Sequence, residues 1–328
     1  MSNDTINGGT GNDTIFAGIG DDLVSGGLGD DIIFDGEGDD TVSGNEGNDI
    51  FWLGSGSSDG RDSLIGGSGD DTLIEDLSNE VAQSLTVFVN LGSGMHSTVG
   101  STGSGADTLS SIENYVLVGD IDLVATGSSA SNYITSDLGD DSISGQQGND
   151  TIDAGGGDDT LIGGSGVDSL IAGDGDDLIF VDNVGDIVHG GGGLDRVNYN
   201  VSSSFEVTLV NWSGVERVDG NAGNDTINGS GYNIAVNLVG NSGADSLTGG
   251  NQEDTLQGGT GNDTIIGGAK RDLIFGNAGA DYMEGGDGND YFLVDDAGDV
   301  VLGGNGFDRV DIDDGGIDIN LSLSLIHI

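Results

Sequence analysis

The sequence predicts an all-β protein, a parallel β-solenoid of stacked 18-residue coils that is interrupted by glycine-poor β segments. First, an aspartate returns every nine residues over long stretches, most strictly between Gly240 and Asp311. Second, the residue two places after each of these aspartates is apolar, which marks an inward-facing strand position. Third, 66 of the 328 residues are glycine and none is proline or cysteine. These observations together favour a repeating β architecture over an ordinary globular domain.

Each nine-residue unit is predicted to hold one short strand and one glycine-rich turn. Residues 258–266 read GGTGNDTII and residues 285–293 read GGDGNDYFL, so the shared pattern is G-G-x-G-x-D-x-U-x with U apolar. Nine residues are too few for a strand, a turn and a helix. Two units therefore close one flattened coil, and successive coils stack by parallel strand pairing. Glycine allows left-handed backbone angles and close approach of neighbouring turns.

The repeats fall into arrays separated by segments with less glycine. We expect a first array over residues 1–80, a degenerate glycine-poor β segment over 81–133, a second array over 134–197, a glycine-poor insert over 198–219 and a third array over 220–311. Residues 312–328 form a tail that fits neither repeat nor cap, and its end, LSLSLIHI, is expected to be non-native. The glycine-poor segments are expected to continue the solenoid as larger coils. The alternative for the segment before residue 134 is a separate ligand-binding domain.

The inward positions of the arrays form a regular apolar series. They are Ile15, Val24, Ile33, Val42 and Phe51 in the first array, Ile143, Ile152, Leu161, Leu170, Ile179, Val188 and Val197 in the second, and Leu247, Leu256, Ile265, Ile274, Met283, Phe292, Val301 and Val310 in the third. A flexible Gly/Ser linker would not keep an aspartate and an apolar residue in register. The series therefore predicts the core of the solenoid.

Stacking would bring the aspartates of successive coils together. At the usual strand spacing of about 4.7–4.9 Å, Asp245 would lie near Asp263, and Asp254 near Asp272 on the opposite edge. Like charges about 5 Å apart cost roughly 3 kcal/mol per pair at an effective dielectric constant near 20. A cation between the turns reverses the sign of this energy. Calcium fits best because it accepts six to eight oxygen ligands in a flexible shell. With no cysteine and three histidines, zinc and copper sites are not expected.

The repeat resembles the RTX (repeats-in-toxin) haemolysin-type calcium-binding nonapeptide of secreted bacterial toxins, proteases, lipases and adhesins. The resemblance implies a β-roll in which an aspartate and turn carbonyls of one coil share a calcium ion with the next coil on the same edge. It implies that the following residues are calcium ligands: Asp13, Asp22, Asp31, Asp40, Asp49, Asp71, Asp141, Asp150, Asp159, Asp168, Asp177, Asp195, Asp225, Asp245, Asp263, Asp281, Asp290 and Asp308. The uninterrupted runs would offer at most about 14 shared Ca²⁺ sites.

Four further aspartates depart from the turn pattern and are left out of this set. Gln252 and Lys270 replace the fourth glycine of the turns before Asp254 and Asp272. The turns at Asp186 and Asp299 have the sequence Val-Asp-x-x-Gly in place of the consensus.

Charge and composition exclude several classes of function. The formal net charge is −52, and only nine of the 58 acidic residues are glutamate, so the acid is mostly the residue short enough to fit inside a turn. Such charge with little apolar content indicates disorder unless it is neutralised. There is no basic patch for nucleic acid, no apolar run long enough for a transmembrane segment, and no signal-peptide pattern in residues 1–10. We predict that the metal-free chain is expanded and that calcium supplies much of the folding free energy.

The resemblance implies a structural segment of a larger secreted bacterial protein, folded by calcium outside the cell or at its surface after export by type I secretion machinery. We expect no enzyme activity. There is no H-E-x-x-H motif, and the G-x-S-x-G at Ser58 lacks the strand and helix that a nucleophile elbow requires.

Two alternatives stay open. One is a C-terminal module of an RTX protease, lipase or epimerase whose catalytic domain is absent. The other is an adhesin segment that binds a cell-surface glycan or ice. Trp212, Tyr199 and Phe205 are the sugar-binding candidates, although isolated aromatic residues favour the β-core or a strand edge. The GTGND turn that would support ice binding occurs only at residues 9–13 and 259–263.

Overall fold

The computed structural model describes residues 2–53, 60–78, 85–99, 106–199 and 203–312. Over these residues the chain is all-β, with one short 3₁₀ helix, η1 (Leu209–Asn211), and no α-helix. The predicted parallel β-solenoid with a coil spacing of about 18 residues is confirmed. The chain divides into two compact units, Met1–Asp177 and Leu178–Ile328. In the described ranges no helix has the length and apolarity needed to cross a membrane.

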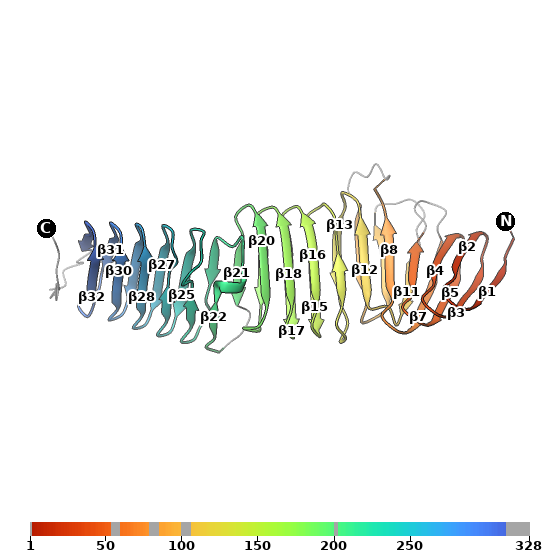
Figure 1. Cartoon of the computed structure of the whole chain (residues 1–328), viewed down its shortest axis with the longest axis horizontal. Helices are drawn as coiled ribbons and strands as arrows, with labels where there is room; N and C mark the ends of the chain where they lie inside the picture. Colours follow the sequence, from red (N-terminus) through yellow and green to blue (C-terminus); the bar gives the residue numbers. More distant parts are fainter. Residues whose placement is uncertain (1, 54–59, 79–84, 100–105, 200–202, 313–328) are drawn as a thin grey trace. The chain divides into compact units, whose positions relative to one another are not determined.

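Unit 1 contains two sheets, and its strands alternate between them along the chain except for three consecutive strands of the first sheet between residues 86 and 110. The colours of Figure 1 follow the order of the strands in the sequence. The strands of its first sheet are β1 (Thr5–Thr10), β3 (Leu23–Leu28), β5 (Thr41–Glu46), β7 (Ser63–Ser68), β9 (Thr86–Asn90), β10 (Met95–Val99), β11 (Asp107–Ser110), β13 (Asp122–Thr126), β15 (Ser142–Gln147) and β17 (Thr160–Ser165). Those of its second sheet are β2 (Thr14–Ile19), β4 (Ile32–Glu37), β6 (Ile50–Leu53), β8 (Thr72–Asp76), β12 (Asn114–Val118), β14 (Tyr133–Thr135), β16 (Thr151–Gly156) and β18 (Ser169–Asp174).

The glycine-poor segment of unit 1 continues the solenoid, but not only with larger parallel coils as predicted. The strand β12 pairs in parallel with β8 and β14, and β13 pairs in parallel with β9 and β15. Between β9 and β11, however, β10 runs antiparallel to both neighbours. A tight turn after β9 reverses the chain, because the Gly94 N–H bonds back to the Asn90 carbonyl at 2.8 Å. The first sheet therefore contains one strand of opposite direction.

Unit 2 repeats the two-sheet arrangement. One sheet contains β19 (Leu178–Val181), β21 (Arg196–Tyr199), β23 (Arg217–Asp219), β25 (Asn237–Ser242), β27 (Thr255–Thr260), β29 (Leu273–Ala278), β31 (Tyr291–Val294) and β33 (Arg309–Ile312). The other contains β22 (Glu206–Thr208), β24 (Thr226–Asn228), β26 (Ser246–Thr248), β28 (Thr264–Ala269), β30 (Tyr282–Asp287) and β32 (Val300–Asn305). A further strand, β20 (Ile187–Gly192), makes an isolated parallel bridge from His189 to Ser213.

The apolar residue of each repeat forms the core, as the pattern predicts. All the predicted inward residues are buried except Val310, which is half-buried on the last described strand. In β17 and β28, for example, the core residues Leu161 and Ile265 alternate with neighbours that are at least partly exposed. Full burial of such a side chain stabilises the fold by about 1.5–3 kcal/mol. The core is thus lined by this apolar column in each sheet of each unit, and in strands such as β31 a second buried apolar residue, Val294 beside Phe292, adds to it.

The turns between strands depend on backbone conformations that glycine provides. Gly27, the second glycine of its repeat, has φ 122°, and a Cβ there would lie 2.2 Å from the Gly9 carbonyl oxygen of the preceding coil. Lys270, which replaces a fourth glycine, nevertheless takes φ 74°. The turn before Asp272 therefore keeps a left-handed backbone conformation at this position, although its sequence departs from the consensus.

Candidate metal centres in the turns

The aspartates of successive coils are joined by direct hydrogen bonds at each sheet edge. The backbone N–H of Asp13 donates to Oδ1 of Asp31 at 2.8 Å, and the N–H of Asp31 donates to Oδ1 of Asp49 at 2.8 Å. In unit 2 the N–H groups of Asp245 and Asp263 bond in the same way to Asp263 and Asp281. We call these rows the aspartate ladders. They confirm the predicted stacking, because ladder members 18 residues apart lie on neighbouring coils.

The ladders include most residues that were predicted as ligands, and they also include others. Predicted ligands on the ladders of unit 1 are Asp13, Asp22, Asp31, Asp40, Asp49, Asp71, Asp141, Asp150, Asp159, Asp168 and Asp177. Those of unit 2 are Asp225, Asp245, Asp263, Asp281, Asp290 and Asp308. The remaining predicted ligand, Asp195, donates its N–H to Glu216 Oε2 at 2.9 Å.

Sequence reasoning missed several members because it relied on the strict nine-residue spacing. Asp62 accepts the Asp40 N–H at 2.8 Å although 22 residues separate them. The Glu113 carboxylate accepts the Asp71 N–H, and the backbone N–H of Asn132 donates to Asp150 Oδ1, so these two residues extend the ladder bonds into the glycine-poor segment. The signal that could have found Asp62 was its place before Ser63-Leu64-Ile65, which repeats the D-x-U pattern.

The second carboxylate oxygen of many ladder aspartates is buried without a hydrogen-bond partner. Within the described part of the chain this holds for Oδ2 of Asp13, Asp22, Asp31, Asp40, Asp49, Asp62, Asp71, Asp150, Asp159, Asp245, Asp263, Asp272, Asp281 and Asp290. Leaving a buried charged oxygen unsatisfied is costly. A row of such oxygens at each edge indicates that something outside the protein completes these sites.

The first glycine of each repeat makes room for this oxygen. A Cβ on Gly258 would lie 2.2 Å from Asp263 Oδ2 and 2.8 Å from the carbonyl oxygen of Gly276. Gly258 does not have a positive φ, so its role here is close approach and not backbone freedom. Two oxygens thus converge beside Gly258, and Oδ2 of Asp263 has no hydrogen-bond partner. Carboxylate and carbonyl oxygens are the ligands that calcium prefers, so this donor set fits that ion.

The raised pKa values of several ladder aspartates also indicate that a cation completes these sites. Burial raises the pKa of Asp159 to about 7, the N–H of Asp141 partly offsets this, and the charges of Asp141 and Asp177 raise it further. Burial likewise raises the pKa of Asp281 to about 7 and that of Asp62 to about 8. The charged form of these carboxylates is therefore disfavoured in the folded chain without a cation. A bound divalent ion would remove this penalty.

The candidate metal centres are not clusters of acidic side chains. Across the residues that the structure covers, no group of three or more His, Cys, Asp or Glu side chains is arranged to hold a metal ion. Each turn instead offers one carboxylate with backbone carbonyls. An ion held there depends on the coil geometry, because carbonyl ligands come into place only when the turns stack.

The aspartates with divergent turns differ among themselves. Oδ2 of Asp254 accepts the Gly250 N–H at 2.6 Å, and Oδ2 of Asp299 accepts the Asp296 N–H at 3.2 Å. Asp186 similarly accepts the Asn183 N–H at 3.1 Å. Among the predicted ligands, Asp225 also has a local partner for Oδ2, the Asn221 N–H at 3.0 Å. Asp272 instead resembles the consensus positions, because its Oδ2 lacks a partner.

A second row of side chains runs beside the ladder in the opposite direction. The residue before the ladder aspartate accepts a backbone N–H from the next coil, as Asn262 Oδ1 does from Ala280 at 2.9 Å. Asp140 accepts from Asp158, and Asn289 accepts from Phe307, in the same geometry. These groups are exposed. They tie adjacent turns together without using the buried oxygens of the candidate metal centres.

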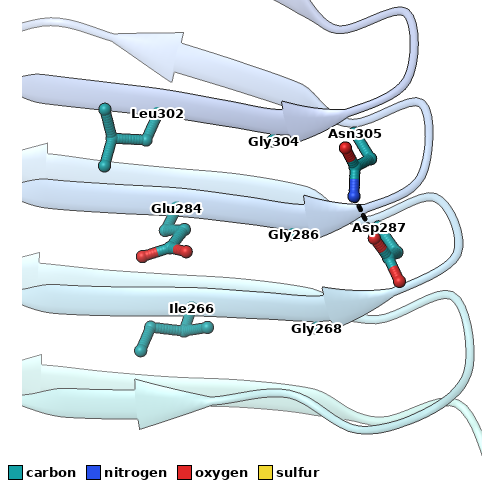
Figure 2. Close-up of a pocket in the computed structure, with 8 residues that line it drawn as sticks. All are labelled: Ile266, Gly268, Glu284, Gly286, Asp287, Leu302, Gly304 and Asn305. Atoms are coloured by element: carbon teal, nitrogen blue, oxygen red, sulfur yellow. Dashed lines mark hydrogen bonds between the residues drawn. The ribbon is translucent and has the colours of Figure 1, made fainter. Parts of the chain in front are cut away.

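The outer face of unit 2 carries a shallow groove of about 600 Å³. Figure 2 shows Ile266, Glu284 and Leu302 on one side and the glycine column Gly268, Gly286 and Gly304 along the floor. At the turn, Asn305 donates to Asp287 Oδ1 at 2.7 Å, which links two coils. The groove lies outside the core and contains no ladder aspartate.

The residues considered for sugar binding are not part of the aspartate ladders. Trp212, Tyr199 and Phe205 are 5–8% exposed, and the rings of Tyr199 and Phe205 stack at 3.7 Å between centroids. Of the two predicted places, the β-core and a strand edge, the structure shows the core. Ser58 and the tail over 313–328 lie outside the described residues.

Most of the chain matches one known family of sequence repeats. The sequence pattern of the RTX calcium-binding nonapeptide repeat, described in four copies, matches residues 2–33, 25–58, 57–74, 126–161, 153–187, 213–231, 237–265 and 257–292. The glycine-poor stretch between residues 74 and 126 is unmatched, in agreement with its lapse from the repeat. None of the curated proteins matches the chain.

Proposed function

Because the chain belongs to the RTX calcium-binding nonapeptide repeat family, we propose that it is a segment of a larger secreted bacterial protein that folds on binding calcium outside the cell or at its surface. Its role is structural, and we expect no catalytic activity of its own. The observation that carries the proposal is the row of buried, unpartnered Oδ2 atoms on the aspartate ladders.

The net charge of −52 supports a dependence on calcium. The ladders bring carboxylates of neighbouring coils within one hydrogen-bonded step, and burial raises the pKa of several of them. Each carboxylate that binds a divalent ion exchanges repulsion for attraction. When ligands come together only in the folded state, the free energy of metal binding is also free energy of folding.

Calcium-dependent folding suits a chain that is exported unfolded. Sites built from few charged ligands bind calcium weakly, with dissociation constants of about 10⁻⁴–10⁻³ M in extracellular modules. Such sites would be empty at cytosolic calcium and filled outside the cell. The chain would then pass through type I secretion machinery as an expanded polymer and fold after export.

Circular dichroism in chelator and in roughly 10 mM calcium, well above the expected dissociation constants, tests the proposal. We expect a weak strand signal in chelator and a strong one with calcium. Magnesium at the same concentration is the control and should restore little structure, because it demands octahedral geometry and retains its water. A strand signal that is equal in chelator and in calcium would contradict the proposal.

Calorimetric titration measures the number of ions. We expect several calcium ions per chain, up to about 14. Binding of no calcium by a folded chain would exclude the proposed role of the ladders.

A further inference from the structure

The glycine-poor segment of unit 1 contains a buried ion cluster that the repeat itself does not have. His96 on β10 lies between two carboxylates, with Nε2 2.8 Å from Glu75 Oε2 and Nδ1 2.7 Å from Asp107 Oδ2. The hydroxyl of Tyr115 donates to the same oxygen of Glu75 at 2.7 Å. His96, Glu75 and Asp107 are each 3–5% exposed. The cluster is therefore shielded from solvent.

Glu75 occupies a core position. On β8 it pairs in register with Leu53 of one neighbouring coil and Leu117 of the other, and both leucines are buried. A carboxylate in an apolar column is strongly destabilising unless it is paired and hydrogen-bonded. The ring of His96 and the hydroxyl of Tyr115 supply that pairing.

Asp107 is a member of an aspartate ladder. Its Oδ1 accepts the Asp62 N–H at 2.9 Å, the same bond that the arrays use. Its Oδ2, however, faces His96 Nδ1, whereas the equivalent oxygen of Asp62 or Asp263 has no partner. The imidazole N–H of His96 thus bonds to Oδ2 of Asp107. In the arrays the equivalent Oδ2 atom faces the candidate metal centre.

The ring carries a positive charge in this geometry. Both nitrogens lie within hydrogen-bond distance of carboxylate oxygens, so both must donate, which only the protonated imidazolium does. Burial alone would lower the pKa of His96, but the charges of Glu75 and Asp107 and their hydrogen bonds outweigh it and raise the pKa to about 10.

The antiparallel strand explains how the histidine reaches this place. β10 is inserted between β9 and β11, and its register sets His96 directly opposite Asp107. In the arrays the neighbouring coil contributes only another glycine turn at the ladder. The reversal of one strand therefore delivers a cationic side chain to the interior.

We infer that His96 is an internal cation that takes the place of calcium at Oδ2 of Asp107, so that the segment from β8 to β13 folds without calcium and seeds the neighbouring coils of unit 1. Folding of a solenoid can start at any stable repeat and propagate to its neighbours. A calcium-independent coil would give the arrays a preformed edge on which to stack. The inference depends only on the interior of unit 1 and holds whether or not the chain is secreted.

Hydrogen exchange of the full chain in chelator, followed by mass spectrometry, tests this inference. We expect protected amides in β8, β9, β12 and β13 of the wild type, and fast exchange in array strands such as β27 and β29. The variant His96→Gln keeps a polar side chain but leaves two buried carboxylates without a cation. In this variant the amide hydrogens of β8, β9, β12 and β13 should exchange at least about tenfold faster in chelator than they do in the wild type.

A second variant separates charge compensation from packing. The triple change E75L/H96L/D107N, made in a Y115F background because the Tyr115 hydroxyl would lose its acceptor Glu75, removes all three charges, extends the leucine column and preserves an acceptor for the Asp62 N–H. We expect it to retain calcium-free protection of the segment where H96Q loses it. Asp263→Asn in unit 2 is the matched control and should leave the protection of this segment in chelator unchanged.

Three results would overturn the inference: a wild-type segment that exchanges as fast as the arrays in chelator, H96Q as protected as the wild type, or a triple variant that loses protection as H96Q does. Failure of the calcium proposal is recognised separately. In that case the array strands themselves would be protected in chelator.

Discussion

The backbone N–H of Asp245 donates a 2.8 Å hydrogen bond to Oδ1 of Asp263, and Oδ2 of Asp263 is buried without a partner. One carboxylate thus performs two tasks. Its first oxygen fixes the distance between two coils, and its second is directed toward a space that the first glycine of the repeat leaves open. The connection between coils and the proposed binding of an ion therefore depend on the same carboxylate at every turn of this kind, and each can be tested separately.

The first prediction concerns the second carboxylate oxygen. Asp263→Asn keeps an acceptor for the Asp245 N–H but removes the charge, so we expect about one calcium ion fewer by calorimetric titration. Asp254→Asn is the matched comparison, because Oδ2 of Asp254 already accepts the Gly250 N–H. We expect that variant to keep the wild-type stoichiometry. Equal stoichiometry for wild type and D263N would contradict this prediction.

The second prediction concerns the first glycine of the repeat. A Cβ in Gly258→Ala would lie 2.2 Å from Asp263 Oδ2, so the carboxylate must move. We expect a cost of about 1–3 kcal/mol to the calcium-bound state, measured by denaturant unfolding, with weaker calcium binding. Thr260→Ala in the same turn is the control and should change the free energy of unfolding by less than about 0.5 kcal/mol. A G258A protein with unaltered calcium affinity would argue against the close-approach role.

The third prediction concerns pH in the absence of calcium. Burial in the folded chain raises the pKa of Asp62 to about 8 and those of Asp159 and Asp281 to about 7, above their ordinary value of 3.8. Their folded-state contribution is therefore most favourable when they are protonated, and it is lost as pH rises through about 7–8. Strand content of the chelator-treated chain should increase between about pH 8 and pH 4, as measured by circular dichroism.

Protonation would in this way replace the missing cation. Asp159→Asn combined with Asp281→Asn removes two of the titrating groups and should flatten the pH dependence. A metal-free strand signal that falls on acidification over this range would show that protonation of these carboxylates does not stabilise the fold.

The fourth prediction concerns the exposed row beside the ladder. Asn262→Ala removes the acceptor of the Ala280 N–H, so we expect a loss of about 0.5–1.5 kcal/mol in the calcium-bound state. The number of bound calcium ions should not change, because the buried Oδ2 of Asp263 is untouched. Thermal unfolding in saturating calcium, together with titration, measures both quantities. A lower stoichiometry in N262A would place this row within the metal centres.

The regular parts of the fold were predictable because each repeat obeys one local rule. Residues such as Leu161 and Ile265 point inward since a strand alternates its faces, and the nine-residue period fixes which aspartates share an edge. The stacking of Asp245 on Asp263 follows from the same period. Where the spacing changes, as between Asp40 and Asp62, the ladder continues although the periodicity does not.

The sequence by itself determined the coil, its apolar column and the oxygen-rich turns, because these depend on contacts between residues at a fixed, short separation. Only the tertiary structure decided which carboxylate oxygens lack a partner, since Asp254 and Asp272 have similar turns but only the first gains a local N–H. It alone also revealed the antiparallel β10 and the pairing of His96 with Glu75, 21 residues apart. Those contacts join segments whose separation follows no period, so chain reversal and packing set them.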